Sequence, residues 1–318
     1  MTINMACVFP GQGSQSVGML GDLAADYPIV TELFATVSER LGFDLWQLVQ
    51  QGPIAKLNQT EYTQVAMLVS DVVVYKILQS QGLPQPLMMA GHSLGEYAAL
   101  VCADAIHLED AAALVARRGQ LMQESVPMGH GAMAAIVGLT DEEVRILCSE
   151  VSTTTNQVTP ANYNAIGQVV IAGHTDAVNK AIKRAQDLGA RLAMTIPVSV
   201  PCHCPLLSEA ALKFSEALES TSFQVPTVPV VSNVDLTIYQ SVVDLKRLLK
   251  EQLYSPVRWV ETIQTMKNKG VERIFECGPG KVLAGLIKRI DKSLHVMSVN
   301  DKASVDLALL EISSLTRA

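Results

Sequence analysis

Long runs of any one chemical character are missing from this sequence. No basic run exceeds two residues and the formal net charge is −7, so nucleic acid is not expected as a partner. Apolar stretches are broken before they reach membrane-spanning length, as at Asp71 and Asp104, which argues against a membrane. The first five residues lack the pattern of a signal peptide, and the six cysteines contain no C-x-x-C pair. We therefore expect a cytoplasmic protein with reduced thiols.

The composition is typical of a soluble protein with a large core. Of the 318 residues, 49% are hydrophobic and 17% are charged, which indicates a folded globular chain rather than a disordered one. A chain of this length holds either one large domain or a large domain that carries a smaller one.

The strongest sign of chemistry is the pentapeptide Gly91-His92-Ser93-Leu94-Gly95, which has the pattern G-x-S-x-G. An apolar run, Leu87–Ala90, is expected as a strand before it, and a helix is expected after it. A serine on such a turn exposes its hydroxyl above the edge of the sheet. The N–H of Leu94 and the helix N-terminus then face any negative charge that develops beside it. The pattern predicts that Ser93 is a nucleophile.

Short apolar runs alternate with longer helical ones from Ala6 to about Val126, and the alternation resumes from Val228. Such alternation predicts a mostly parallel sheet covered by helices on both faces. Helix 64–78 is apolar on nearly every side, so it should be deeply buried. The predicted strands are Ala6–Phe9 and Leu87–Ala90; the predicted helices are Ile29–Leu41, Gln64–Leu78, one after Leu94 and one around Leu108–Gln123.

The segment between these two parts has a different order of predicted strands and helices. After a turn cluster at Pro127–Gly131 the order is βαββαβ, the ferredoxin-like arrangement. We predict an α/β chain with a large domain of residues 1–127 and 198–318, an inserted small domain of residues 128–197, and a substrate cleft between them. The strands of the insertion are expected at Ala132–Leu139, Val158–Tyr163, Gln168–Ala172 and Arg191–Ile196, and its helices after Thr140 and over Thr175–Leu188.

His203 is the histidine best suited to act as a base for the serine. Pro201 and Pro205 fix the backbone around it, which helps to hold an imidazole within reach of a hydroxyl. Two alternatives stay open: a simple turn histidine, and a metal site with Cys202 and Cys204, whose spacing is poor for that purpose. The other histidines are interpreted as a packed neighbour (His92), surface residues (His107 and His130), a helix cap (His174) and a core residue (His295).

Four motifs occur together along the chain: Phe9-Pro10-Gly11-Gln12-Gly13-Ser14-Gln15, Gly91-His92-Ser93-Leu94-Gly95-Glu96-Tyr97, Val198-Ser199-Val200-Pro201-Cys202-His203 and Glu276-Cys277-Gly278-Pro279-Gly280-Lys281-Val282-Leu283. With them the chain resembles, over essentially its whole length, the malonyl-CoA:acyl carrier protein transacylases of bacterial type II fatty acid synthesis. The resemblance implies an α/β-hydrolase-like large domain with a ferredoxin-like insertion. It also implies ping-pong transfer of malonyl from malonyl-CoA to the phosphopantetheine thiol of acyl carrier protein, with no cofactor and no metal.

The resemblance assigns roles to individual positions. It implies that Ser93 becomes malonylated, that His203 acts as its base, and that Gln12 and the N–H of Leu94 form the oxyanion hole. In the same way Arg118 is expected to pair with the free carboxylate of the malonyl group.

Such a pairing is chemically reasonable, because a planar guanidinium grips a carboxylate through two parallel hydrogen bonds. Arg117, the neighbour of Arg118, is interpreted as a solvated helix charge. The resemblance further implies that Gln252 helps to hold the histidine and to line the site. Cys202 stands where serine is common in the family, so sensitivity to thiol reagents is an expectation.

Two other functions are compared with this one. An esterase or thioesterase would complete a Ser–acid–His order, but the carboxylates considered for that role fall in helix starts or turns, where capping explains them. A non-catalytic scaffold that binds the carrier would not need Ser93, His203, Gln12 and Arg118 together. The carboxylates considered are Glu109, Asp110, Asp141, Glu142, Glu143 and Asp176.

Two groups of cations are candidates for binding an acidic carrier protein. One group lies in the inserted domain and the other follows the Gly278-Pro279-Gly280 turn, so we expect them to flank the cleft. They are Lys180, Lys183, Arg184 and Arg191, and Lys281, Lys288 and Arg289.

Overall fold

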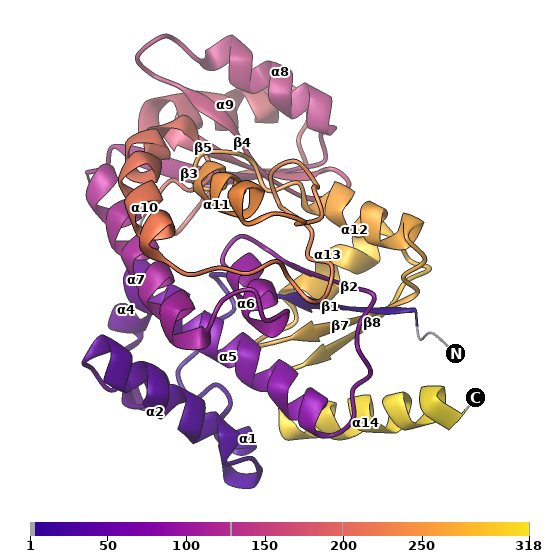
Figure 1. Cartoon of the computed structure of the whole chain (residues 1–318). Helices are drawn as coiled ribbons and strands as arrows, with labels where there is room; N and C mark the ends of the chain where they lie inside the picture. Colours follow the sequence, from indigo (N-terminus) through magenta and orange to yellow (C-terminus); the bar gives the residue numbers. More distant parts are fainter. Residues whose placement is uncertain (1–3, 128, 199, 318) are drawn as a thin grey trace.

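Two four-stranded sheets organise the chain (Figure 1). The computed structural model describes residues 4–127, 129–198 and 200–317, so Met128 and Ser199, at the predicted junctions, lie outside the described residues. Sheet A has the order β2-β1-β7-β8 and all its strands are parallel. Its strands are β1 (Met5–Phe9), β2 (Met88–Gly91), β7 (Arg273–Cys277) and β8 (His295–Val299).

Strands β1 and β2 of sheet A are buried on both faces, which explains why they are continuously apolar. Along β1, Met5, Cys7 and Phe9 pack into one core, and Ala6 and Val8 pack into another. The first core includes α5 (Thr60–Ser80) and α6 (Gly95–Cys102), and the second includes α12 (Trp259–Asn268) and α13 (Val282–Ile290). Helix α5 is buried along almost its whole length, as predicted, and it begins four residues before the predicted Gln64.

Sheet B is antiparallel and has the order β4-β5-β3-β6. Together with two helices on one face, this is the ferredoxin-like arrangement, so the predicted α/β fold with a ferredoxin-like unit is confirmed. In Figure 1 this unit forms the upper part of the molecule. Its elements are β3 (Gly131–Val137), α8 (Asp141–Val151), β4 (Val158–Ala165), β5 (Gln168–His174), α9 (Thr175–Asp187) and β6 (Leu192–Ile196).

The two faces of sheet B have different neighbours. Residues such as Ile136 and Ile171 pack under α8 and α9. Met133 and Val170 point the other way, toward the segment around Cys204 and a cavity beside Ser93. Sheet B therefore forms one wall of that cavity, and α9 lies on its far side.

The remaining helices complete the large part of the chain. Helix α2 has the predicted bounds, whereas α10 was not predicted. Strand β3 ends at Val137, before the predicted Leu139, because Gly138 has a φ of +101° that no extended strand adopts. The helices are α1 (Gly21–Asp26), α2 (Ile29–Leu41), α3 (Leu45–Gln51), α4 (Ile54–Leu57), α7 (Leu108–Ser125), α10 (Ser208–Ser220), α11 (Val242–Glu251) and α14 (Lys302–Arg317), with a 3₁₀ turn at Pro205–Leu207.

Within the ranges described, none of these helices combines the length and apolar character needed to span a membrane.

Candidate active site

Ser93 lies on the tight turn between β2 and α6. Its φ of +53° is rare for a residue with a side chain. The turn is held from outside by Asn233, whose Oδ1 accepts a hydrogen bond from Ser93 N at 2.7 Å and whose Nδ2 donates to Gly91 O at 2.8 Å. The predicted strand, turn and helix are all present around the serine.

The two glycines of the pentapeptide are needed because other backbone comes so close. A Cβ on Gly91 would lie 1.8 Å from the carbonyl carbon of Gly95, and one on Gly95 would lie 2.0 Å from Phe9 O. Any larger residue at either position would push helix α6 away from β1 and β2. The positive φ itself falls on Ser93.

His203 reaches Ser93 across 110 residues of sequence. Its Nε2 lies 2.7 Å from Ser93 Oγ, and its Nδ1 lies 2.7 Å from the carbonyl oxygen of Gln252. A carbonyl only accepts hydrogen bonds, so Nδ1 carries the proton and Nε2 is left to accept from the serine hydroxyl. A backbone bond from His203 N to Leu253 O, at 3.0 Å, fixes the same loop.

The histidine is neutral at physiological pH. It is 3% exposed, and burial, followed by the positive charge of Arg118, lowers the pKa of His203 to about 3. A neutral imidazole is the form that takes a proton from a hydroxyl.

Arg118 is the charged side chain closest to this pair. It is 1% exposed, and one guanidinium nitrogen donates to Gln252 Oε1 at 2.9 Å while lying 3.4 Å from Ser93 Oγ. Its Nε has no hydrogen-bond partner in the described part of the chain. Arg117, by contrast, is exposed and donates to Gln120.

A cavity of about 490 Å³ opens beside these groups. Its wall includes Ser93, His203, Arg118 and Gln12, together with residues of sheet B and of α13. The loop that carries Gln12 lies against the serine elbow, which is the turn between β2 and α6 that carries Ser93. A Cβ on Gly11 would come 2.5 Å from His92 O and 3.8 Å from Leu94 N. The N–H of Leu94 opens helix α6, where the first N–H groups have no acceptor within the helix. The cavity therefore brings together Gln12, Ser93, Leu94, Arg118 and His203.

Gln252 lies behind the cavity rather than on its wall. It is 1% exposed and is absent from the lining residues. Its backbone carbonyl holds His203, as the resemblance implied, but its side chain contacts Arg118 and the carbonyl of Ser93.

One histidine interpretation is wrong and another holds only in part. His295 is exposed and lies 3.0 Å from Glu311 Oε2 at the surface, so it is not a core residue. His174 occupies the predicted N-cap position of α9, but its side chain makes no capping hydrogen bond in the described chain, and its Nδ1 instead accepts from Gln157 N. His92 packs against Trp259 and bonds to Asn164, as a packed neighbour would.

The cysteines beside His203 point to backbone. The thiols of Cys202 and Cys204 lie near the carbonyls of Val200 and Pro201, and no group of three or more metal-binding side chains occurs among the residues described. Burial raises the pKa of Cys202 to about 11, which argues against its reactivity with thiol reagents at neutral pH.

Sequence reasoning missed two groups that hold the elbow. Asn233 follows the short apolar run Val228–Val231, whose Val230 pairs in parallel with Met89 of β2. A polar residue at the carboxyl end of a strand-like run was the available signal. The other group, Glu96, is 1% exposed and contacts Tyr239, Gln252 and the N–H of Asn233.

Comparisons with known proteins agree on one family over nearly the whole chain. Residues 6–306 match the acyl transferase domain family. The chain is 50% identical over 304 residues to a malonyl CoA-acyl carrier protein transacylase of Escherichia coli (strain K12), covering 96% of this chain and 98% of that protein. It is 40% identical over 305 residues to the protein of that name from Bacillus subtilis (strain 168), covering 96% of each.

Solved structures agree with the sequence comparisons. A malonyl CoA-acyl carrier protein transacylase from Coxiella burnetii superposes with a TM-score of 0.96 at 46% identity, covering 98% of each chain. A malonyl-transacylase solved in complex with a type II PKS acyl-carrier protein gives a TM-score of 0.95 at 49% identity, covering 97% of this chain and 99% of that one. This chain is thus an acyltransferase, and it belongs to the family of malonyl CoA-acyl carrier protein transacylases.

Proposed function

We propose that this protein transfers a malonyl group from malonyl-CoA to the phosphopantetheine thiol of acyl carrier protein, through a malonyl ester on Ser93. The observation that carries the proposal is a nucleophile–base pair in the same cavity as a buried arginine. The Ser93–His203 pair supplies acyl transfer chemistry. The Nε of Arg118 lacks a protein partner in the described chain and so favours an acyl group that ends in a carboxylate.

Each half-reaction follows from these positions. His203 Nε2 takes the proton of Ser93 Oγ as the oxygen attacks the thioester carbonyl. The oxyanion is stabilised by the N–H of Leu94 and by Gln12. The C–S bond then breaks, the departing CoA sulfur receives the proton from His203, and Ser93 is left as an ester. The thiol of the carrier enters and reverses these steps.

The reaction needs no cofactor in this proposal, because the thioester already carries the activated acyl group. We also propose that the protein works in the cytoplasm. All six cysteines are free, as expected for a reducing compartment.

The kinetic test of the proposal is an initial-rate study in which malonyl-CoA and carrier protein are both varied. A covalent intermediate that forms before the carrier binds predicts parallel lines in double-reciprocal plots. Intersecting lines would indicate direct transfer in a ternary complex and would remove the ester from the mechanism.

We further propose the division into a catalytic domain of residues 1–127 and 198–318 and an inserted domain of residues 128–197. Support comes from the sheets, since the strands of sheet B all lie between Gly131 and Ile196 and those of sheet A lie outside that range. Each part also has a core of its own.

The cations predicted to bind the carrier do not all lie where they were expected. Lys180, Lys183 and Arg184 lie on α9, which covers the face of sheet B opposite the cavity, so they do not flank the cleft. Arg191 and Arg289 line a groove between the two parts, and Arg289 donates to Gln168 of β5 at 2.6 Å.

Helix α13 links the cavity to this groove. Val282 and Leu286 line the cavity, and Arg289 follows them by seven and three residues, which places it on the same side of the helix. Lys288 and Arg289 are both exposed. We propose these two cations of α13 as part of the carrier-binding surface.

Charge reversal at Lys288 and Arg289 should slow transfer to the carrier by roughly tenfold at low salt, with malonylation by CoA nearly unchanged. The deficit should shrink as salt is added, because screening weakens the attraction in the parent protein too. The matched control is reversal of Lys180 and Lys183, which changes the net charge equally on the far face and should have little effect. Equal deficits in both variants would show that only net charge matters and that α13 has no special part.

A further inference from the structure

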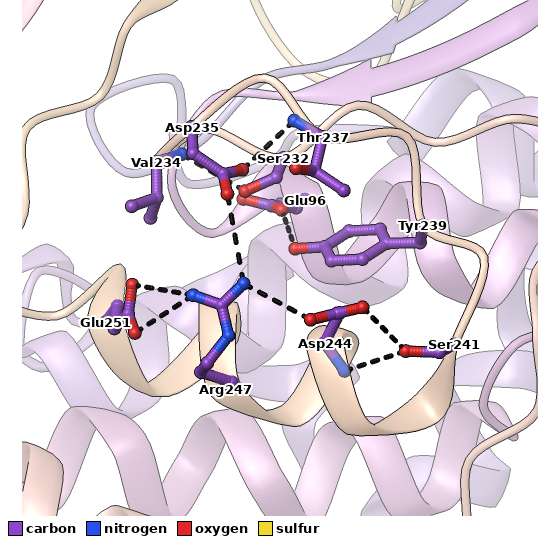
Figure 2. A network of polar contacts seen from close by, with 10 residues as sticks. All are labelled: Glu96, Ser232, Val234, Asp235, Thr237, Tyr239, Ser241, Asp244, Arg247 and Glu251. Carbon is purple, nitrogen blue, oxygen red and sulfur yellow. Dashed lines mark hydrogen bonds and ion pairs between the residues drawn. The ribbon is translucent and has the colours of Figure 1, made fainter.

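Glu96 is a buried carboxylate that the mechanism above does not use. It stands in the first turn of α6, three residues after Ser93. One carboxylate oxygen accepts from Tyr239 Oη at 2.5 Å, and the other accepts from Gln252 Nε2 at 2.6 Å and lies 3.3 Å from Asn233 N. Figure 2 shows the carboxylate of Glu96 facing the tyrosine hydroxyl. All three donors around this buried acidic group are neutral, so no ion pair holds it in place.

The contacts of Gln252 connect Glu96 to Arg118. The Nε2 of Gln252 donates to Glu96 and also to Ser93 O at 3.0 Å, while its Oε1 accepts from Arg118 at 2.9 Å. A carboxylate and a carbonyl can only accept, so both require the NH₂ of the amide on their side. The amide oxygen is thereby directed at Arg118.

We propose that Glu96 is a positioning residue that sets the preference for a carboxylate-bearing acyl group, acting through Gln252 on Arg118. The proposal rests on the proposed function and adds the origin of its selectivity. Through this chain of bonds the guanidinium is held by a neutral amide oxygen. The Nε of the guanidinium has no hydrogen-bond partner among the residues described, which leaves that donor to the substrate.

The amide of Gln252 also keeps the carboxyl group of Glu96 apart from the guanidinium of Arg118. Were Glu96 in direct contact with Arg118, its carboxylate would compete with that of the substrate for the same donors. Separated by one amide, it offsets part of the cost of burying the guanidinium without occupying it. Burial raises the pKa of Glu96 to about 7, while the bonds from Tyr239 and Gln252 and the charge of Arg118 act in the opposite direction.

The frame around Glu96 is fixed by polar contacts outside the site. Gln252 directly follows α11, and Arg247 of that helix contacts Glu251, Asp244 and Asp235. Figure 2 shows Arg247 between these three carboxylates. Asp244 and Glu251 lie on α11 itself, whereas Asp235 at 3.9 Å lies outside it, so the Arg247–Asp235 contact links α11 to the loop that leads to Tyr239. Two partners of Glu96, Tyr239 and Gln252, thus flank this contact in the chain.

The test compares malonyl-CoA and acetyl-CoA as donors for Glu96→Gln, a replacement of nearly equal size. Its amide can offer either a donor or an acceptor to Gln252, so the orientation of Gln252 is no longer enforced. The kcat/KM for malonyl transfer should fall about tenfold, with acetyl transfer reduced less than about twofold. The matched control is Glu209→Gln, which removes an exposed ion pair with Lys213 on α10 and should leave both donors unchanged.

A double-mutant cycle identifies the route of the effect. In an Arg118→Ala background, Glu96→Gln should cost less than about twofold further in malonyl transfer, because the group it positions is gone. Additive losses would assign Glu96 a separate role and overturn the proposal.

An unchanged ratio of malonyl to acetyl transfer in Glu96→Gln would also overturn it. If that variant does not fold, Tyr239→Phe takes its place, because it frees one oxygen of Glu96 and should shift the ratio in the same direction; an unchanged ratio there is equally contrary. Failure of the parent protein to accept malonyl would instead refute the proposed function, so the two failures are distinguishable.

Discussion

The Ser93→Ala protein should form no covalent malonyl adduct, and its rate of transfer to carrier protein should fall by about 10⁴-fold or more. The reason is that His203 Nε2 lies 2.7 Å from Ser93 Oγ and is paired with no other nucleophile among the residues that the structure describes. Losses of this size are typical when the nucleophile of an acyl transfer enzyme is removed. The measurement is the mass of the protein after incubation with malonyl-CoA, alongside the rate of carrier malonylation.

Ser125→Ala is the control, since Ser125 lies at the end of α7 and its hydroxyl donates to Leu121 O of the same helix. It should be labelled as fast as the parent. A Ser93→Ala protein that still carries the malonyl group would assign the ester to another residue.

Loss of Arg118 should have the second largest effect, and it should depend on the donor. Arg118→Ala is expected to cost roughly 2–4 kcal/mol in kcat/KM for malonyl-CoA, which is about 30- to 1,000-fold, because charge-assisted hydrogen bonds to the malonyl carboxylate are lost. Acetyl-CoA has no carboxylate, so its transfer should fall much less or even improve. The rates of Ser93 acylation by the two donors measure the difference.

Arg117→Ala is the matched control, one residue away on the same helix but exposed and bonded to Gln120. It should leave both donors unaffected. Equal losses for malonyl-CoA and acetyl-CoA in Arg118→Ala would contradict the pairing and indicate that the buried guanidinium is structural.

The elbow was predictable from the sequence because its requirements are local. A strand, a tight turn and a helix within a dozen residues leave few residue types possible, and the contacts of Gly91 and Gly95 explain both glycines. The two sheets followed from the order of the elements: short apolar strands separated by helices predicted sheet A, and the order βαββαβ predicted sheet B.

The contacts that depend on the third dimension were not predictable. Glu96 and Asn233 are 137 positions apart and meet only when the elbow and a later loop are folded together. Glu96 also follows the elbow motif directly, so nothing in the local pattern marks it as a buried acid. His295 sits in an apolar run but belongs to the edge strand β8, where its side chain reaches the surface and Glu311.

The position of the cations on α9 was unpredictable for the same reason. Lys183 and Arg184 are adjacent cations in the inserted unit, and the sequence does not say which face of sheet B their helix covers. Arg184 instead pairs with Glu150 of α8 on the far side from the cavity.

The central claim is that the acyl group rests on Ser93 between donor and carrier. Intact-protein mass spectrometry tests it most directly, first after mixing with malonyl-CoA alone and then after adding phosphopantetheinylated carrier protein. The account predicts a gain of one malonyl group in the first step, located on the peptide that contains Ser93, and its loss to the carrier in the second. A protein that transfers malonyl to the carrier at full rate while its own mass never changes would contradict the account.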